Sequence, residues 1–199
     1  MTAPLILAFD TSAAHCAAAL LSGDVLLAAR SEEMGRGQAE RLMPMLEEVL
    51  AEAGAGWRDL AALGVGIGPG NFTGVRIAVA AARGLALGLA VPAIGVTGFE
   101  ARAFAGPRPL WVAIEAPRAQ AYLQRFGPDT APELLPATAV EALDAPVLWL
   151  SDLSGAEMAG NIARIASERR GNALSRPAPL YLRPADAAPM REAPPVILP

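Results

Sequence analysis

The chain has 199 residues, of which 53% are hydrophobic and 18% are charged, and its formal net charge at pH 7 is −4. This composition excludes an intrinsically disordered chain, which combines few apolar residues with a strong net charge. All sixteen basic residues are arginine, and twenty acidic residues outnumber them. Nucleic-acid binding depends on a broad positive surface, so we expect any polynucleotide partner to be held by another protein.

Cysteine and histidine each occur once, as Cys16 and His15. That count excludes disulfide frameworks and zinc sites built from cysteine and histidine. A single thiol suits a reducing compartment, and no basic residue or cleavage-like segment precedes Asp10. We therefore predict a cytoplasmic protein without a secretory signal. The apolar run at 84–99 is short and broken by Pro92, which favours a buried segment over a membrane span.

The first half of the chain combines short apolar runs with helical periods. Two runs flank Ser22-Gly23-Asp24, which is a hairpin signal. From Gln38 onward, apolar residues recur every three or four positions until Gly54, which ends an amphipathic helix. Thr97 and Glu100 form a capping box that opens a short helix. The predicted elements before that helix are strands at 5–9, 16–21 and 25–29, a helix at 38–53, a strand at 60–67, a helix at 75–89 and a strand at 93–96.

The second half begins at a linker-like Gly-Pro-Arg-Pro segment, 106–109. We therefore predict an N-terminal lobe at 1–105 and a C-terminal lobe at 106–199. Capping boxes predict two helices, at Thr138 with Glu141 and at Ser154 with Glu157. The predicted strands are 110–114, 121–126 and 147–150. Frequent prolines from Arg176 onward predict an extended tail along the surface.

The order of these elements indicates the fold class. Strands, helix, strand, helix and strand in succession predict an α/β protein with a mixed sheet and helices packed on it. The second half has the pattern of a shorter relative of the first. We therefore expect two lobes, of which the second is reduced.

Two turns carry groups that bind phosphate in other proteins. The first turn follows the first strand, and its candidate residues are Asp10, Thr11 and Ser12. An acidic residue there could hold a hydrated magnesium ion, while hydroxyls and turn amides bind phosphate. The second turn joins a strand to a helix, where exposed amides and the helix dipole favour an anion. Its candidate residues are Gly68, Gly70, Asn71, Thr73 and Gly74, with Asn71 or Thr73 as the N-cap.

A structural interpretation remains open for both turns. Asp10 and Ser12 would satisfy backbone amides in a tight turn, and the glycines of the second turn would allow close packing of the next helix. The second turn is not a Walker loop, because the chain has no lysine, and it lacks the dinucleotide-binding spacing. We interpret any phosphate site here as vestigial.

No pattern predicts catalysis. The chain has no Gly-x-Ser-x-Gly nucleophile elbow, His15 is its only imidazole, and Cys16 lies in an apolar run typical of an inert core thiol. Glu115 and Arg118 form either a ligand clamp or a local ion pair in a turn. We predict no catalytic residue and no metal site.

The two longer helices of the first half carry more apolar surface than one sheet-facing stripe needs. A helix that is apolar on two faces must bury both, so we predict a partner interface, with packing inside the chain's own core as the alternative. Gly84 and Gly88 continue a stripe from Ala80, which indicates that another backbone passes close by. A second copy or a relative would complete a four-helix interface. The predicted interface residues are Leu42, Met43, Leu46, Leu50, Arg76, Val79, Ala80 and Arg83.

Several segments together resemble the TsaB family, the non-catalytic dimerisation subunit of the bacterial complex that makes threonylcarbamoyl-adenosine in tRNA. The segment 66–77, Gly-Ile-Gly-Pro-Gly-Asn-Phe-Thr-Gly-Val-Arg-Ile, is the most specific of them. The other segments that carry the resemblance are 6–12, 40–45 and 84–86, with Tyr122 and 179–183 in the second half.

The resemblance implies a glycoprotease-like protein with an actin/hexokinase-like fold, ribonuclease-H-like in each lobe. It implies that the first two helices bind a catalytic paralogue, which holds a metal through two histidines, and that the chain is a homodimer when alone. A small ATPase subunit would join the complex, and tRNA would be contacted only through it. No tightly bound cofactor is implied, only weak ATP or ADP with magnesium at a partner interface, and no membrane contact.

The chain departs from the family pattern at two places. Gln38 stands where the family usually has histidine, and Glu115-Ala116-Pro117-Arg118 replaces the family's Asp-Ala-Arg-Arg turn. Two other functions stay open at this point. One is an ATP-dependent small-molecule kinase or phosphatase of the same fold, and the other is a peptidase.

Overall fold

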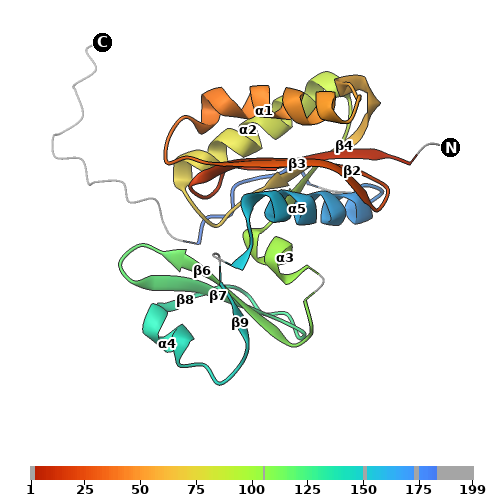
Figure 1. Cartoon of the computed structure of the whole chain (residues 1–199). Helices are drawn as coiled ribbons and strands as arrows, with labels where there is room; N and C mark the ends of the chain where they lie inside the picture. Colours follow the sequence, from red (N-terminus) through yellow and green to blue (C-terminus); the bar gives the residue numbers. More distant parts are fainter. Residues whose placement is uncertain (1–2, 105, 150–151, 173–174, 183–199) are drawn as a thin grey trace, which may run out of the picture.

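The computed structural model of the chain describes residues 3–104, 106–149, 152–172 and 175–182. Its strands form two sheets, and helices cover both faces of the larger one (Figure 1). The predicted fold class, a mixed α/β protein with packed helices, is confirmed.

The larger sheet contains both antiparallel and parallel strands. Its members are β1 (Leu5–Asp10), β2 (His15–Ser22), β3 (Val25–Glu33), β4 (Leu60–Gly66) and β5 (Ala93–Val96). Their order is β3-β2-β1-β4-β5. The first three form an antiparallel meander with the predicted hairpin, in which Gly23 has φ 58°. β4 and β5 run parallel to β1, because a helix returns the chain between them.

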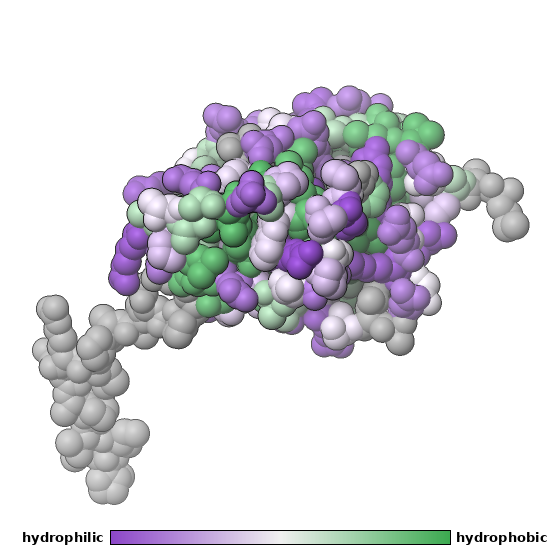
Figure 2. All heavy atoms as spheres, turned by 90° about the horizontal axis from the view of Figure 1, so that it is seen from below, coloured by the Kyte–Doolittle hydropathy of each residue, from purple (hydrophilic) through white to green (hydrophobic). Residues whose placement is uncertain are grey.

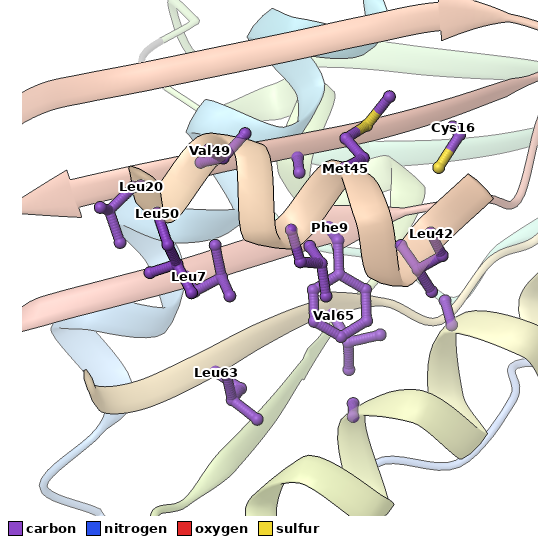
Figure 3. Packing of buried hydrophobic residues seen from close by; sticks show 14 of the residues in the cluster. Leu7, Phe9, Cys16, Leu20, Leu42, Met45, Val49, Leu50, Leu63 and Val65 are labelled. Carbon is purple, nitrogen blue, oxygen red and sulfur yellow. The ribbon is translucent and has the colours of Figure 1, made fainter. Parts of the chain in front are cut away.

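Two helices cover one face of this sheet, α1 (Gln38–Glu52) and α2 (Phe72–Leu89). Side chains alternate between the two faces of a strand, so Leu7 and Phe9 of β1 point toward these helices. Figure 3 shows Leu42 and Met45 of α1 among the residues packed with them. This cluster is the larger apolar core of the molecule.

The opposite face of the sheet is covered by α5 (Gly155–Arg169). Its Met158 and Ile162 pack against Ile6 and Ala8, the β1 residues that point away from α1. Because α5 belongs to the second half of the chain, the predicted division into 1–105 and 106–199 is wrong for this helix. Both faces of the sheet are apolar, and each needs a covering layer.

The smaller sheet follows the short helix α3 (Gly98–Ala103). Its strands are β6 (Leu110–Ala116), β7 (Gln120–Phe126), β8 (Glu133–Pro136) and β9 (Val147–Leu148), in the order β8-β7-β6-β9. The strand β8 and the 3-10 turn η1 (Trp57–Asp59) were not predicted. The capping box at Thr138 is wrong, because α4 (Ala137–Glu141) begins directly after β8 and places Thr138 inside the helix. The capping boxes at Thr97 and Ser154 are confirmed.

The last described segment, 175–182, returns to the larger sheet, and we call it the C-terminal strap. The Leu180 amide donates a hydrogen bond to the Ile67 carbonyl at 2.8 Å, and Arg83 Nε donates to the Pro177 carbonyl at 2.7 Å. The rest of the predicted tail, 183–199, lies outside the described residues. Viewed from below, the surface shows hydrophobic residues in separate patches between hydrophilic ones (Figure 2).

The packing of α1 predicts different costs for two apolar residues on that helix. Leu46 is 0% exposed in the core, whereas Met43 is 37% exposed. Leu46→Ala should lower the free energy of unfolding by about 2–5 kcal/mol because it leaves a cavity, and Met43→Ala by about 0.5 kcal/mol. Urea unfolding followed by circular dichroism measures both. Equal losses in the two variants would contradict this description of α1.

Candidate functional site

In the turn after β1, several polar groups bind one carboxylate, that of Asp10. Asp10 is 1% exposed, and its Oδ2 accepts hydrogen bonds from the Ser12 amide at 3.1 Å and the Ser12 hydroxyl at 2.9 Å. His15 Nε2 lies 2.7 Å from the same oxygen. Within the described residues, Oδ1 of Asp10 is buried and has no hydrogen-bond partner. Ser12 and His15 therefore both bind Asp10, an arrangement unlike that of a nucleophile and its base.

The two predicted phosphate turns lie against each other. Thr11 Oγ1 donates a hydrogen bond to the Gly74 carbonyl at 2.7 Å, and the Asn71 amide donates to the Ser12 carbonyl at 2.7 Å. A Cβ atom added at Gly74 would collide with the Thr11 carbonyl oxygen, and one at Gly70 with that of Ser12. The glycines are therefore required by close backbone contact.

The start of α2 is capped by the chain itself. Asn71 is the N-cap, as predicted, and its Oδ1 accepts from the amides of Thr73 and Gly74, both at 3.0 Å. These amides are among those that would bind a phosphate at a helix N-terminus. The Gly68 carbonyl accepts from the Gly98 amide at 2.8 Å. The structure thus brings the predicted turn residues together, but their polar groups largely bind one another.

Cys16 agrees with its predicted role. It is buried, and burial raises the pKa of its thiol to about 11. Such a thiol is protonated at neutral pH and unreactive. In the described part of the chain, no three histidine, cysteine, aspartate or glutamate residues gather closely enough to hold a metal ion.

A cleft of about 1300 Å³ lies between the two sheets, beside these turns. One wall carries Ser12 and Gly70, and the opposite wall carries Ile114 and Glu115 of β6. Gln38, at the start of α1, also lines the cleft, and its Nε2 donates to the Met34 carbonyl at 3.0 Å. Gln38 thus stabilises the turn before α1.

Arg102 of α3 also lines this cleft and was not predicted as a site residue. It is 5% exposed, and its Nη1 donates to the Gly98 carbonyl at 2.7 Å. Burial lowers the pKa of its guanidinium to about 10, against the opposing effect of Asp10 and Glu115. An arginine in a short helix is usually exposed, so nothing in the sequence marks this position.

The predicted interface residues divide into two groups. Leu42, Leu46 and Leu50 of α1 and Val79 of α2 are at most 3% exposed and pack in the chain's own core. Their assignment to a partner interface is wrong, because the sheet and the neighbouring helix together bury a wide arc of α1. Figure 3 shows Leu42 and Leu50 among the core residues. The remaining predicted residues, Met43, Arg76, Ala80 and Arg83, lie at the surface.

The exposed face of α2 continues past the residues predicted for it. Leu87 is 83% exposed, and a Cβ atom added at Gly84 or Gly88 would find no atom of another described element within 4 Å. The predicted burial of the run 84–99 is therefore wrong for its first residues. No described backbone approaches the two glycines.

At the N-terminal end of α2, the exposed face of the helix contacts the C-terminal strap. The Arg76 guanidinium lies 3.7 Å from the centre of the Phe72 ring, and its Nε donates to the Tyr181 hydroxyl at 2.8 Å. The Phe72 and Tyr181 rings are 5.3 Å apart. The hydrogen bond between Arg76 and Tyr181 joins residues 105 positions apart, which explains why helical periodicity did not predict the contact with the strap.

By length and composition, α2 is the one helix of the described residues that could cross a membrane, with 18 residues and a mean hydropathy of 1.4. It nevertheless connects β4 to β5 of one sheet. Its Val75, Ala78 and Ala82 belong to the core of that sheet. The helix therefore combines a packed face with an exposed apolar face.

Comparison with known proteins assigns the chain to a family. A family model described as TsaD, tRNA N6-adenosine threonylcarbamoyltransferase, matches residues 31–181. The tRNA threonylcarbamoyladenosine biosynthesis protein TsaB of Escherichia coli is 44% identical over 92 residues, and that of Haemophilus influenzae is 40% identical over 99 residues. The chain belongs to the TsaB family, and its residues 31–181 are similar to the TsaD domain.

The matches with these two TsaB proteins cover 46% and 49% of this chain but 39% and 41% of the relatives. The chain thus spans less than half the length of the curated TsaB proteins that it matches. An uncharacterized protein of Mycobacterium tuberculosis is 31% identical over 93% of this chain and 94% of its own length.

A solved structure shares the whole fold of this TsaB-family chain. YeaZ from Pseudomonas aeruginosa superimposes with a TM-score of 0.73 at 27% identity, over 90% of this chain and 100% of that one. A second structure, that of an uncharacterized protein with similarity to peptidase YEAZ from Pseudomonas aeruginosa, has a TM-score of 0.72. In the present chain, the Ser12 hydroxyl and His15 Nε2 each bind Asp10 Oδ2.

Two glycines of α2 test the description of its two faces. Gly74→Ala should lower the free energy of unfolding by about 1–3 kcal/mol, because the new Cβ meets the Thr11 carbonyl. Gly84→Ala should raise it by about 0.5–1 kcal/mol, because alanine restricts the unfolded chain and fills open space. Chemical unfolding of the isolated protein measures both changes. A destabilised Gly84→Ala variant would mean that another part of the chain covers this face.

Proposed function

We propose that this chain is a non-catalytic subunit in the biosynthesis of threonylcarbamoyladenosine in tRNA, and that it binds and activates a TsaD-type catalytic protein. The TsaB relatives support this pathway, since they are named for that biosynthesis. The similarity to those relatives covers less than half of their length.

The observation that carries the partner role is the uncovered face of α2. Leu87 is almost fully exposed, and the surface at Gly84 and Gly88 is open. The distance between packed helices depends on the side chains at their contact, so a partner helix could approach closely at these glycines. An exposed apolar face of this kind is typical of a protein–protein contact.

The neighbouring helix adds to the same surface. On one flank of α1, Arg41 binds Glu32 of β3 and Glu48, so this flank faces the edge of the sheet. Met43 lies on the other flank, by the geometry of a helix with 3.6 residues per turn. α1 and α2 would thus present Met43 together with Ala80 and Leu87. Two helices from each chain would form a four-helix interface, with the same faces paired in a homodimer.

The polar turns support a non-catalytic role. Donors that a phosphate would need are bound to Asn71, Ser12 and Gly74, and His15 is bound to Asp10. The kinase or phosphatase alternative needs those groups for a magnesium nucleotide and gains no support from this arrangement.

The other components follow from the proposed complex. The partner would be a paralogue with a two-histidine metal site, joined by a small ATPase subunit. Any ATP or ADP with magnesium would bind weakly at a partner interface. With a net charge of −4, the chain would contact tRNA only through the complex, in the cytoplasm.

Paired arginine substitutions test the proposed interface. Leu87→Arg on α2 places a charge on the proposed surface, whereas Leu27→Arg on β3 places one on another exposed apolar position. Both variants should fold. We expect Leu87→Arg to weaken association with a TsaD-type protein, and self-association, at least ten-fold, and Leu27→Arg to leave both unchanged. Sedimentation velocity measures association, and circular dichroism verifies folding.

The opposite pattern would overturn the proposal. If Leu87→Arg associates like the parent chain while Leu27→Arg does not, the partner surface lies on the edge of the sheet. If the parent chain binds neither itself nor a TsaD-type protein, the partner role is wrong.

A further inference from the structure

A buried cation without an ionic partner lies at the inner side of the cleft. Arg102 is 5% exposed, and no carboxylate of the described residues forms an ion pair with it. Its Nη1 binds the Gly98 carbonyl, and its buried Nε has no hydrogen-bond partner in the same part of the chain. Burying a charge is costly unless it is paired and fully hydrogen-bonded. The fold therefore holds a cation whose binding capacity is only partly used.

The position of this guanidinium is fixed by the walls of the cleft. Nη1 would lie 2.9 Å, and Ile114 Cδ1 3.2 Å, from a Cβ atom added at Gly98. Ile114 lines the cleft, and the Gly98 amide binds the Gly68 carbonyl of the turn before α2. The cation thus lies where the turn before α2 and the β6 strand approach each other.

The remaining wall of the cleft is rich in aromatic and apolar side chains. Phe72, Tyr122 and Tyr181 line it, together with Leu180 of the C-terminal strap. Ligand sites of proteins combine such apolar walls with a few polar groups that fix the orientation of the ligand. With about 1300 Å³, the cleft has room for a small organic molecule.

We propose that this cleft binds a small organic carboxylate, with the carboxylate on Arg102 and an apolar or aromatic body against Phe72, Tyr122 and Tyr181. A planar guanidinium matches the geometry of a carboxylate. Arg102 belongs neither to the proposed partner interface nor to the contact between the two turns.

The charges around the cleft favour a monoanion over a phosphate. Asp10 and Glu115 act on Arg102 electrostatically and would repel the second charge of a phosphate. The amides of Thr73 and Gly74, which would bind phosphate at the start of α2, are bound to Asn71. Arg76 also lines the cleft, but its guanidinium is held by the Phe72 ring and the Tyr181 hydroxyl. One buried cation, Arg102, with two acidic neighbours suits one carboxylate.

The test compares three probes on the full chain by NMR titration at low salt. The probes are phenylacetate, its neutral analogue phenylacetamide, and inorganic phosphate. We expect phenylacetate to bind at least ten-fold more tightly than either of the others, since a hydrogen bond to a charged group contributes about 10- to 100-fold in affinity. Equal binding of the amide and the carboxylate, preference for phosphate, or no binding of phenylacetate would each overturn the proposal.

Three variants locate the binding. Arg102→Met should abolish the preference for phenylacetate over phenylacetamide. Arg125→Met is the matched control, because Arg125 also has a buried Nε without a partner among the described residues but does not line the cleft. It should leave binding unchanged. Glu115→Gln removes an exposed acid near the site and should tighten phenylacetate binding about two-fold.

The Glu115 variant keeps the test decisive if Arg102→Met fails to fold, because Glu115 is exposed. Retained selectivity in a folded Arg102→Met variant would overturn the proposal. Weaker phenylacetate binding in Glu115→Gln would also overturn it.

Discussion

The contact between two backbone turns determines how this molecule is arranged. The Thr11 hydroxyl binds the Gly74 carbonyl and the Asn71 amide binds the Ser12 carbonyl, at a separation that allows no side chain at Gly70 or Gly74. This contact fixes the first turn of α2 on the sheet. Since a helix is rigid along its length, it also fixes which face of α2 points outward. The exposed face and one wall of the cleft follow from this single junction.

The same contact occupies groups that a phosphate site would need. When a donor already binds a neighbouring carbonyl, a ligand that takes its place adds little binding free energy, because one hydrogen bond is lost for the one that forms. The hydrogen bonds within these turns therefore hold the two turns together and leave few free donors for a ligand. The groups on which the proposals rest are the apolar surface of α2 and one incompletely paired cation, Arg102, in the cleft. The proposed scaffold role and the proposed ligand site would centre on different residues, Leu87 and Arg102.

The sequence predicted those local features well that depend on residues adjacent in the chain. The end of α1 near Gly54, the N-cap Asn71 and the capping boxes at Thr97 and Ser154 depend on adjacent residues, and the structure has all of them. The buried face of α1 was assigned too narrowly. Periodicity measures the apolar arc of a helix, but only the fold reveals whether one neighbour or two cover it. Leu46 was therefore placed in an interface although it belongs to the core.

Features that join distant parts of the chain escaped prediction. The return of α5 to the larger sheet, the strap bound to Arg76 and Arg83, and the burial of Arg102 all depend on contacts between separate segments. Of the residues predicted for the interface, Arg76, Ala80 and Arg83 of α2 are exposed, because they lie off its core stripe. The segment 66–77, which carried the family resemblance, contains Gly70 and Gly74, the glycines at the contact between the two turns.

Hydroxyl-radical footprinting of the chain with and without a TsaD-type protein tests most directly whether the outward face of α2 is the partner surface. The reaction rates of Met43 and Leu87 should fall at least five-fold in the mixture, while those of Leu26 and Leu27 on β3, also exposed in the free chain, should stay unchanged. Unchanged rates at Met43 and Leu87 in a mixture that forms a complex would contradict the account.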